Sequence, residues 1–217
     1  MPDFIRARSE EQKQQRMQEI KTAADALFAS QPYQAITLTT IAEQLQCSRA
    51  QLYKYVTTKE EIFLELSADK REAYFAALKA AFPAGCEYSN EVFAEVWAGI
   101  LNGHKSYLRY CDILMTIIET NVTVERLAVF KKNYYESADA VIAQLSESLH
   151  LSPDRAEALF YDVYYHAVGI NSACYNNPLV REAMALIGRE AAPPDFRRNL
   201  KEFILMCLTH YRPSRDK

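Results

Sequence analysis

Glycine is scarce in this chain. Five glycines occur among 217 residues, about a third of the usual ~7% share. β-Hairpins and phosphate-binding loops depend on residues that tolerate positive φ, so the scarcity disfavours folds rich in either. Hydrophobic residues make up 49% of the chain and charged residues 24%, a balance that excludes intrinsic disorder. A helical protein with a sizeable core is therefore favoured.

Long apolar runs are also missing. The longest uncharged stretch, residues 163–180, still contains one histidine and several asparagines, so no membrane-spanning helix is expected. Residues 1–10 contain Asp3, Arg6 and Arg8, and no apolar segment of signal-peptide length follows them. The sequence therefore predicts a cytoplasmic protein.

The chain has no paired cysteines and no familiar catalytic motif. Its five cysteines are widely spaced and include no C-x-x-C pair, which favours buried thiols in a reducing compartment. These cysteines are Cys47, Cys86, Cys111, Cys174 and Cys207. No nucleophile elbow, phosphate loop, dinucleotide fingerprint or zinc-protease helix motif occurs, so we expect no enzyme and no cofactor.

A metal sensor is the weaker alternative for the histidines. The best local cluster is His104 with Cys111 and Asp112, and its spacing is looser than metal ligands normally show. We therefore expect no metal site.

Charge is distributed unevenly along the chain. Residues 1–59 contain eight basic and six acidic residues, whereas the remainder contains 17 basic and 22 acidic ones. A mildly cationic N-terminal part on an acidic remainder fits a module that binds a polyanion.

Helical periodicity runs through most of the sequence. Apolar residues with helical spacing, N-cap residues and prolines predict helices at about 11–30, 38–45, 48–55, 58–81, 90–109, 112–121, 123–149, 153–176 and 195–211. A further short helix is expected within 179–190, between Asn177-Pro178 and Pro193-Pro194. No segment shows the alternation typical of strands, so the expected fold class is all-α.

Residues 37–59, TLTTIAEQLQCSRAQLYKYVTTK, carry the functional signal. Thr37 and Ser48 are N-cap residues of two short helices separated by about four turn residues, as in a helix-turn-helix. A small residue, Ala42, stands where the helices would cross, and Cys47 with Leu52 would fill the wedge between them. The second helix would then present its polar side chains to a DNA major groove.

This region resembles the tetracycline-repressor-like (TetR) transcriptional regulators. The resemblance covers about 50 residues, Glu19 to Leu66, and is carried by A-x-x-L-F (24–28), T-x-x-x-I-A (37–42), S-x-x-x-L-Y-x-Y (48–55) and K-E-E-I (59–62). One departure is Gln46, where the family usually has glycine. If this position is left-handed, a side chain there costs on the order of 1 kcal/mol.

The resemblance implies a three-helix DNA-binding head, residues 1–58, on a larger helical body, residues 59–217, that dimerises and binds a small molecule. It implies base contacts from Thr39, Arg49, Ala50 and Gln51, and phosphate contacts from Thr37, Ser48, Tyr53, Lys54, Tyr55 and Lys59. Arginine and glutamine are suited to guanine and adenine edges respectively, in agreement with these roles. Tyr53 has a second interpretation, packing against the preceding helix. Arg6 and Arg8 either reach the DNA or belong to a solvated tail.

The body is rich in aromatic residues, which are typical of small-molecule pockets. The candidate ligand-binding residues are Phe93, Trp97, Tyr107, Met115, Ile118, Asn121, Phe130, Tyr134, Tyr161, Tyr165 and His166. The alternative is that these residues form ordinary core, with His166 a buried, hydrogen-bonded imidazole.

A homodimer is expected because a two-fold pair of recognition helices about 34–36 Å apart reads a palindrome. The candidate interface, a four-helix bundle formed by the last two long helices of each copy, consists of Leu159, Val163, Ala167, Ile170, Cys174, Phe196, Leu200, Phe203, Ile204, Cys207 and Leu208. Packing within one chain is the alternative for each of them.

The leading functional hypothesis is a repressor that a small, largely apolar or aromatic effector releases from a palindromic DNA operator. A helical adaptor that binds a protein instead of DNA is the alternative. The sequence does not identify the operator, the effector, the regulated genes or the sign of regulation.

Overall fold

The computed structural model describes residues 2–83, 85–174, 178–189 and 194–212, with side chains for all of these except 2–10, 174 and 178. Most of the described residues are helical and none lies in a strand, which confirms the all-α expectation. No described helix is long and apolar enough to cross a membrane.

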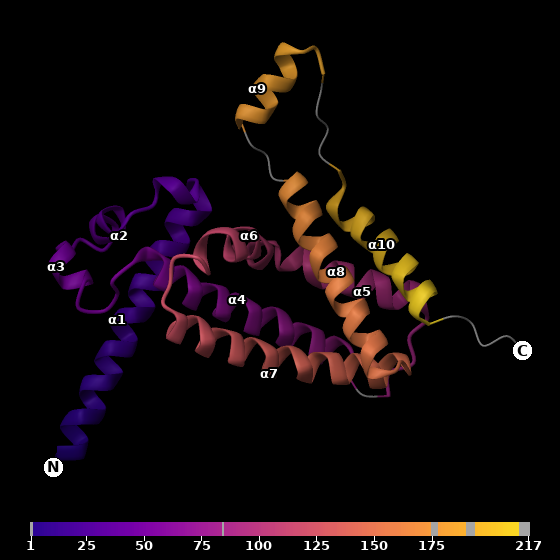
Figure 1. Cartoon of the computed structure of the whole chain (residues 1–217), viewed down its shortest axis with the longest axis horizontal. Coiled ribbons are helices and arrows are strands. Elements are labelled where there is room, and N and C mark those ends of the chain that lie inside the picture. The colour runs from indigo at the N-terminus through magenta and orange to yellow at the C-terminus, as the bar shows by residue number, and fades with distance from the viewer. Residues whose placement is uncertain (1, 84, 175–177, 190–193, 213–217) are drawn as a thin grey trace, which may run out of the picture. The chain divides into compact units, whose positions relative to one another are not determined.

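The helices follow one another along the chain as Figure 1 shows. Their bounds are α1 Pro2–Ser30, η1 Tyr33–Ala35 (a 3-10 turn), α2 Leu38–Gln44, α3 Arg49–Leu52, α4 Lys59–Ala81, α5 Asn90–Gly103, α6 Lys105–Ile113, η2 Leu114–Ile118 (a π-helical segment), α7 Val124–Leu149, α8 Pro153–Cys174, α9 Pro178–Leu186 and α10 Phe196–Tyr211.

Several of the sequence-based boundaries differ from the structure. The helix expected at 48–55 ends at Leu52, and the break expected between 109 and 112 is absent. The first helix begins at Pro2 instead of about residue 11, and proline suits the first helical position because it lacks an N–H that would need a partner. The helix expected at 90–109 is interrupted at His104, directly after Gly103, a poor helix former. A second helix then runs from Lys105 to Ile113 and continues into η2.

The chain divides into two compact units. The head unit comprises Met1–Asp69 together with Leu114–Phe130, and the body unit comprises Lys70–Ile113 with Lys131–Lys217. The head unit therefore differs from the expected 1–58: it includes the start of α4 and takes in a segment from the middle of the chain. Sequence periodicity could not show this, because the segment is distant along the chain.

The head unit is built around an aromatic cluster. Phe63 on α4 packs edge-to-face against Phe28 on α1 at 5.3 Å and against Tyr33 of η1 at 4.9 Å between ring centroids. Ile20, Ala23, Ala24, Leu27 and Phe28 recur with helical spacing and form an apolar stripe along α1. Leu27 is half-buried and the other four are buried. The stripe thus holds α1 in the core of the unit, as its spacing predicted.

The body unit has a larger apolar core. Phe82 stacks on Phe93 at 3.8 Å between centroids, and Trp97 donates a buried hydrogen bond of 2.9 Å to the hydroxyl of Tyr74. Helix α10 packs against α5 and α8, and α6 also packs against α8. These contacts bury the apolar faces of the C-terminal helices.

Candidate nucleic-acid interface

Helices α2 and α3 are each fixed by a capping box. The Thr37 hydroxyl accepts from the Thr40 N–H, and the Thr40 hydroxyl accepts from the Thr37 N–H. Ser48 and Gln51 form the same reciprocal pair at the start of α3. Both helix starts are therefore satisfied by local side chains, as the N-cap signals predicted.

The turn between the helices has left-handed geometry at Gln46, whose φ is 51°. The Gln46 N–H donates to the Glu43 carbonyl, and the Cys47 N–H donates to the Ala42 carbonyl, the pattern of a Schellman motif. The position that usually holds glycine in the family thus adopts the conformation that favours glycine, and glutamine occupies it.

Packing beneath the helices agrees with the expected geometry. Ala42 and Leu52 are each 2% exposed, and Cys47 is half-buried. Ser48, Arg49, Ala50, Gln51 and Lys54 are all exposed on α3 and the turn that follows it. The apolar side of the motif is inside the head unit, and its polar side is open to a ligand.

Arg49 is held in place by Tyr53. Its Nη2 donates to the Tyr53 hydroxyl at 2.9 Å, and its guanidinium lies 5.6 Å from the centre of the Tyr53 ring. The Tyr53 side chain is 46% exposed. Tyr53 therefore supports the arginine on the open face, which gives its ring a role besides a phosphate contact.

The side chain of Gln51 is already engaged in a hydrogen bond within the chain. Its Oε1 accepts from the Ser48 N–H at 3.0 Å as part of the capping box. Pairing with an adenine edge requires the amide oxygen to accept and the amide nitrogen to donate. Gln51 would have to use the second lone pair of Oε1 for adenine or break the cap.

Lys59 differs most from its expected role as a phosphate contact. Its Nζ donates to the carbonyls of Tyr33 at 3.0 Å and Ile36 at 2.7 Å, and it lies 3.9 Å from the centre of the Tyr33 ring. Partial burial lowers the pKa of Lys59, and the Tyr33 hydroxyl donates to Glu60 at 2.6 Å. Lys59 and Glu60 together attach η1 to the start of α4, so the ammonium group already has partners within the head unit.

The remaining candidates for DNA contacts differ in exposure. Thr37 is exposed, whereas Thr39 and Tyr55 are half-buried. The side chains of Arg6 and Arg8 lie outside the described residues. Their expected contacts stay predictions.

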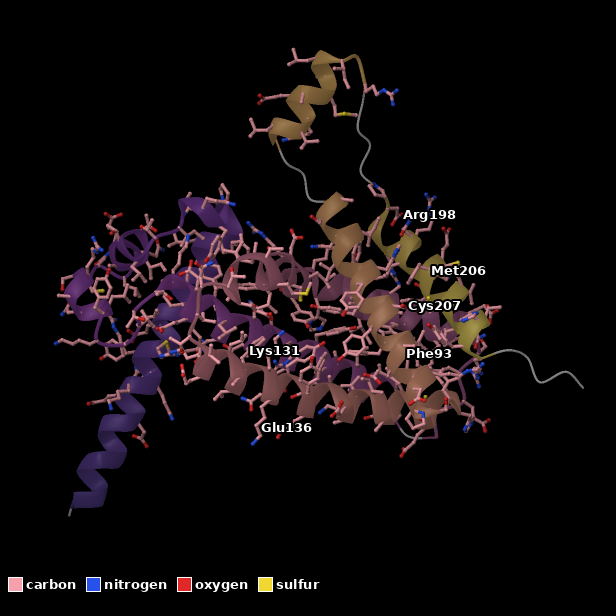
Figure 2. All side chains as sticks on the ribbon, in the orientation of Figure 1. Phe93, Lys131, Glu136, Arg198, Met206 and Cys207 are labelled. Atoms are coloured by element: carbon pink, nitrogen blue, oxygen red, sulfur yellow. The ribbon has the colours of Figure 1, made fainter. Side chains whose placement is uncertain are left out.

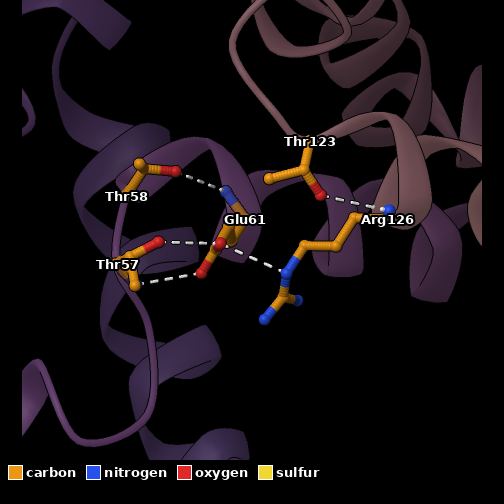
Figure 3. Close-up of polar contacts among 5 residues, drawn as sticks. All are labelled: Thr57, Thr58, Glu61, Thr123 and Arg126. Atoms are coloured by element: carbon orange, nitrogen blue, oxygen red, sulfur yellow. Dashed lines mark hydrogen bonds and ion pairs between the residues drawn. The ribbon is translucent and has the colours of Figure 1, made fainter.

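A buried carboxylate near α3 was missed by sequence reasoning. Glu61 is 6% exposed and lies at the start of α4, where it faces Thr57 and Arg126 (Figure 3). Thr58 and Glu61 have the spacing of a capping box, and one half of it is present, since the Thr58 hydroxyl accepts from the Glu61 N–H at 3.3 Å. The Glu61 side chain, however, accepts from the Thr57 N–H instead of the Thr58 N–H.

The ligand-binding candidates are divided between the two units. Met115, Ile118, Asn121 and Phe130 belong to the head unit, and the other seven belong to the body unit. Phe93 and Trp97 are fully buried in the core of the body. A shallow pocket lined by Leu78, Lys79, Phe82, Val141, Gln144 and Leu145 includes none of the candidates.

Several candidates meet in a tyrosine cluster of the body unit. Tyr161 stacks on Tyr165 at 6.0 Å between ring centroids, and Tyr134 lies beside Tyr161. Tyr107 and Tyr164 lie beside the Cys111 thiol, whose pKa burial raises to about 12. Cys111 is therefore a neutral thiol in this core, and the cluster supplies phenol groups amid apolar surface.

His166 is a hydrogen-bonded imidazole. It stacks on Phe203 at 3.7 Å between ring centroids and pairs through Nε2 with Asn199 at 2.9 Å. It thus connects α8 to α10; the ring is hydrogen-bonded, as in the alternative stated for it, but it is half-buried instead of buried. No group of three metal-ligating side chains occurs among the described side chains.

Most of the candidate interface residues lie inside the body unit. Eight of them are at most 6% exposed in the single chain: Leu159, Val163, Ala167, Phe196, Leu200, Ile204, Cys207 and Leu208. These side chains have almost no accessible area left to bury against a second copy, so their burial favours the alternative of packing within one chain. Ile170 and Phe203 are half-buried, and the side chain of Cys174 lies outside the described residues.

The opposite face of the same two helices is open. Tyr165 on α8 is 57% exposed and Met206 on α10 is 60% exposed. Met206 and Cys207, both labelled in Figure 2, are neighbours in sequence, but Met206 is exposed whereas Cys207 is buried. The face of α8 and α10 defined by Tyr165, His166, Ile170, Phe203 and Met206 is called the outer face below.

Comparison with known proteins gives one family for both parts of the chain. Residues 20–66 match the model described as "Bacterial regulatory proteins, tetR family", and residues 68–212 match "Tetracyclin repressor-like, C-terminal domain". No curated protein matches the chain significantly.

Solved structures with a similar fold include three regulators. A TetR/AcrR-family transcriptional regulator from Thermobifida fusca is 16% identical with a TM-score of 0.55, over 91% of this chain and 99% of that one. The fatty acid degradation regulator FadR from Bacillus halodurans is 13% identical with a TM-score of 0.55, over 93% and 97%. FadR from Thermus thermophilus, solved in complex with lauroyl-CoA, is 17% identical with a TM-score of 0.53, over 93% and 97%. Because the two family models together match almost the whole chain, this protein belongs to the TetR family of bacterial regulatory proteins.

Proposed function

We propose that this protein is a repressor that binds a palindromic DNA operator as a homodimer and leaves it when a small, largely apolar or aromatic molecule binds the body unit. The observation that carries the proposal is the open face of α3, where Tyr53 holds the exposed Arg49. A positioned guanidinium is suited to the two acceptors of a guanine edge. Such a regulator would act in the cytoplasm, where bacterial operators are.

The homodimer supplies the second half of the palindrome. One α3 presents only a few side chains, so two copies with their recognition helices about 34–36 Å apart are needed to read a full site. We assign the contact between copies to the outer face, because its apolar side chains remain accessible in the single chain.

The effector is proposed to bind near the tyrosine cluster of α6, α7 and α8. Phenol hydroxyls amid apolar side chains suit a molecule with a large apolar part and few polar groups. The lauroyl-CoA complex of the Thermus thermophilus FadR makes an acyl thioester one reasonable probe. Thermal shift with a panel of aromatic and acyl compounds, followed by operator release, would identify the class.

Selection from random duplex DNA tests the proposal directly. The purified protein should enrich a palindromic sequence, and its affinity for that sequence should fall steeply with salt. The Arg49→Ala, Gln51→Ala variant should lose discrimination between the winner and unrelated DNA. A Lys132→Ala variant, altered at an exposed lysine of the body unit, should discriminate as the wild type does.

The adaptor alternative predicts a different result. In that case no sequence is enriched, and wild type and the Arg49→Ala, Gln51→Ala variant bind DNA equally weakly while dimerisation is intact. That outcome would overturn the DNA-binding proposal and direct the search to a protein partner.

A further inference from the structure

The carboxylate of Glu61 is the meeting point of three donors from two distant segments. It accepts from the Thr57 N–H at 2.9 Å, from the Thr57 hydroxyl at 2.8 Å and from Arg126 Nε at 3.2 Å (Figure 3). The Glu61 side chain is 7% exposed, whereas that of Arg126 is 45% exposed. A nearly buried carboxylate is thus stabilised by one cation that comes from more than 60 residues along the chain.

Arg126 occupies an unfavourable place in its own helix. Thr123 is the N-cap of α7, since its hydroxyl accepts from the Arg126 N–H at 3.3 Å, and Arg126 is therefore the third helical residue. Acidic residues are favoured there, because the helix N-terminus is positive and a glutamate can complete a capping box. The local sequence gives no reason for an arginine, but Glu61 across the unit does.

Thr57 connects this ion pair to the DNA-binding motif. The helical hydrogen bonds that begin in α3 end with the Val56 N–H on the Leu52 carbonyl, and Thr57 follows directly. Glu61 therefore fixes the short turn between α3 and α4, and this turn sets the direction of α3 relative to α4. Arg126 completes this arrangement from the segment Leu114–Phe130, which belongs to the head unit.

We propose that Glu61 and Arg126 form a latch through which the first turn of α7 sets the orientation of α3. Both are positioning residues for DNA binding: neither is expected to touch DNA. This inference rests on the proposed function for its effect on DNA. Helix α7 continues from the latch to Leu149, so a displacement of α7 along its length would reach the latch through a continuous helix.

The latch and simple electrostatics predict different effects of one substitution on DNA affinity. Glu61→Gln makes the head unit more positive, which by charge alone should strengthen binding to every DNA. The latch predicts instead that the ratio of affinities for the selected sequence and for unrelated DNA falls by about fivefold, which corresponds to an ordinary interaction energy between neighbouring residues. Arg126→Gln changes charge in the other direction and should lower the same ratio.

Matched controls are available on α7. Lys132 and Glu136 form an exposed pair at 3.8 Å in the body unit, so Lys132→Gln and Glu136→Gln reproduce the two charge changes away from the latch. Each control should keep the affinity ratio within about twofold, as expected of exposed pairs. Arg126→Gln alters a half-exposed side chain and should fold, and stoichiometric titration would correct all affinities for the active fraction.

Hydrogen exchange without DNA gives an independent readout. The amides of residues 49–61 should exchange faster in Glu61→Gln and in Arg126→Gln than in the wild type. In the double variant they should exchange no faster than in the more affected single variant, because both substitutions break the same contact. Unchanged exchange, or affinity ratios equal to those of the controls, would overturn the latch. If wild type selects no DNA while both variants lose protection, the proposed function fails and the latch as a feature of the fold stands.

Discussion

Two lysines of the head unit show how surroundings decide the use of a side chain. Lys54 is exposed on the turn after α3, whereas Lys59 donates to two backbone carbonyls and lies over the Tyr33 ring. Both were expected to bind phosphates. Only Lys54 keeps the exposure that this role requires.

The two lysines should separate stability from DNA binding. Lys59→Gln should lower the free energy of unfolding by about 1–2 kcal/mol, because two carbonyls lose a charged donor. Lys54→Gln should leave stability within about 0.5 kcal/mol and reduce the slope of log affinity against log salt by about 1. Urea denaturation and salt titrations on the selected DNA would measure both effects. Equal loss of stability in the two variants would contradict this division.

Gln46 carries a backbone cost that glycine would remove. Its φ of 51° lies in the left-handed region, where a β-carbon is unfavourable. Gln46→Gly should raise the free energy of unfolding by about 0.5–1 kcal/mol, less than the full strain because glycine also increases the entropy of the unfolded chain.

His150, which follows α7 and has a φ of 54°, provides a second test of the same cost. His150→Gly should have a similar stabilising effect in the body unit. Urea denaturation of both variants checks the prediction, and a loss of stability in Gln46→Gly would show that the glutamine side chain makes a compensating contact.

At the scale of elements, the break between α5 and α6 is the clearest departure from periodicity. His104 ends α5, and its carbonyl accepts from the N–H groups of Tyr107 and Leu108 at the start of α6. Its ring lies 5.9 Å from the Tyr74 ring between centroids. The histidine therefore stands at a junction of three helices in the body unit, and burial lowers its pKa.

This junction should make stability depend on pH. The folded pKa of His104 lies below the ordinary value of 6.5, so the unfolded chain binds the proton more readily and stability falls as pH drops below about 6.5. His104→Gln should reduce the fall in Tm between pH 7 and pH 5.5, measured by calorimetry. His210→Gln, at an exposed position near the end of α10, should follow the wild type. A His104→Gln curve parallel to that of wild type would argue against this assignment.

At the scale of the whole molecule, an operator-binding regulator needs its second copy. The sequence suggested α8 and α10, but the residues it selected are mostly core in the single chain, and the outer face is therefore our proposed contact. Helix α9 is a second apolar surface, since Leu179 is 73% exposed and Leu186 is 88% exposed. The two surfaces can be tested separately.

The double variant Tyr165→Asp, Met206→Asp should be monomeric, because it places charges at the centre of the proposed contact without altering a buried side chain. Sedimentation velocity at micromolar concentration would show the loss of the dimer, and affinity for the palindrome should fall with it. Leu186→Asp should remain dimeric. Monomeric Leu186→Asp beside a dimeric double variant would assign the interface to α9.

The sequence by itself determined the local features of this protein. Caps at Thr37 and Ser48, the stripe on α1 and the small residue at Ala42 act through neighbours a few positions away, so periodicity and residue type were enough to predict the helix-turn-helix. The scarcity of glycine and the lack of strand-like alternation favoured an all-α fold.

Only the tertiary structure decided which side chains meet across the chain. Lys59 binds the carbonyls of η1, Arg126 reaches Glu61, and the apolar faces of α8 and α10 bury each other's residues. These outcomes depend on contacts between residues 23 or more positions apart, and a pattern with a period of 3.6 residues shows which side of a helix is apolar without showing which surface covers it.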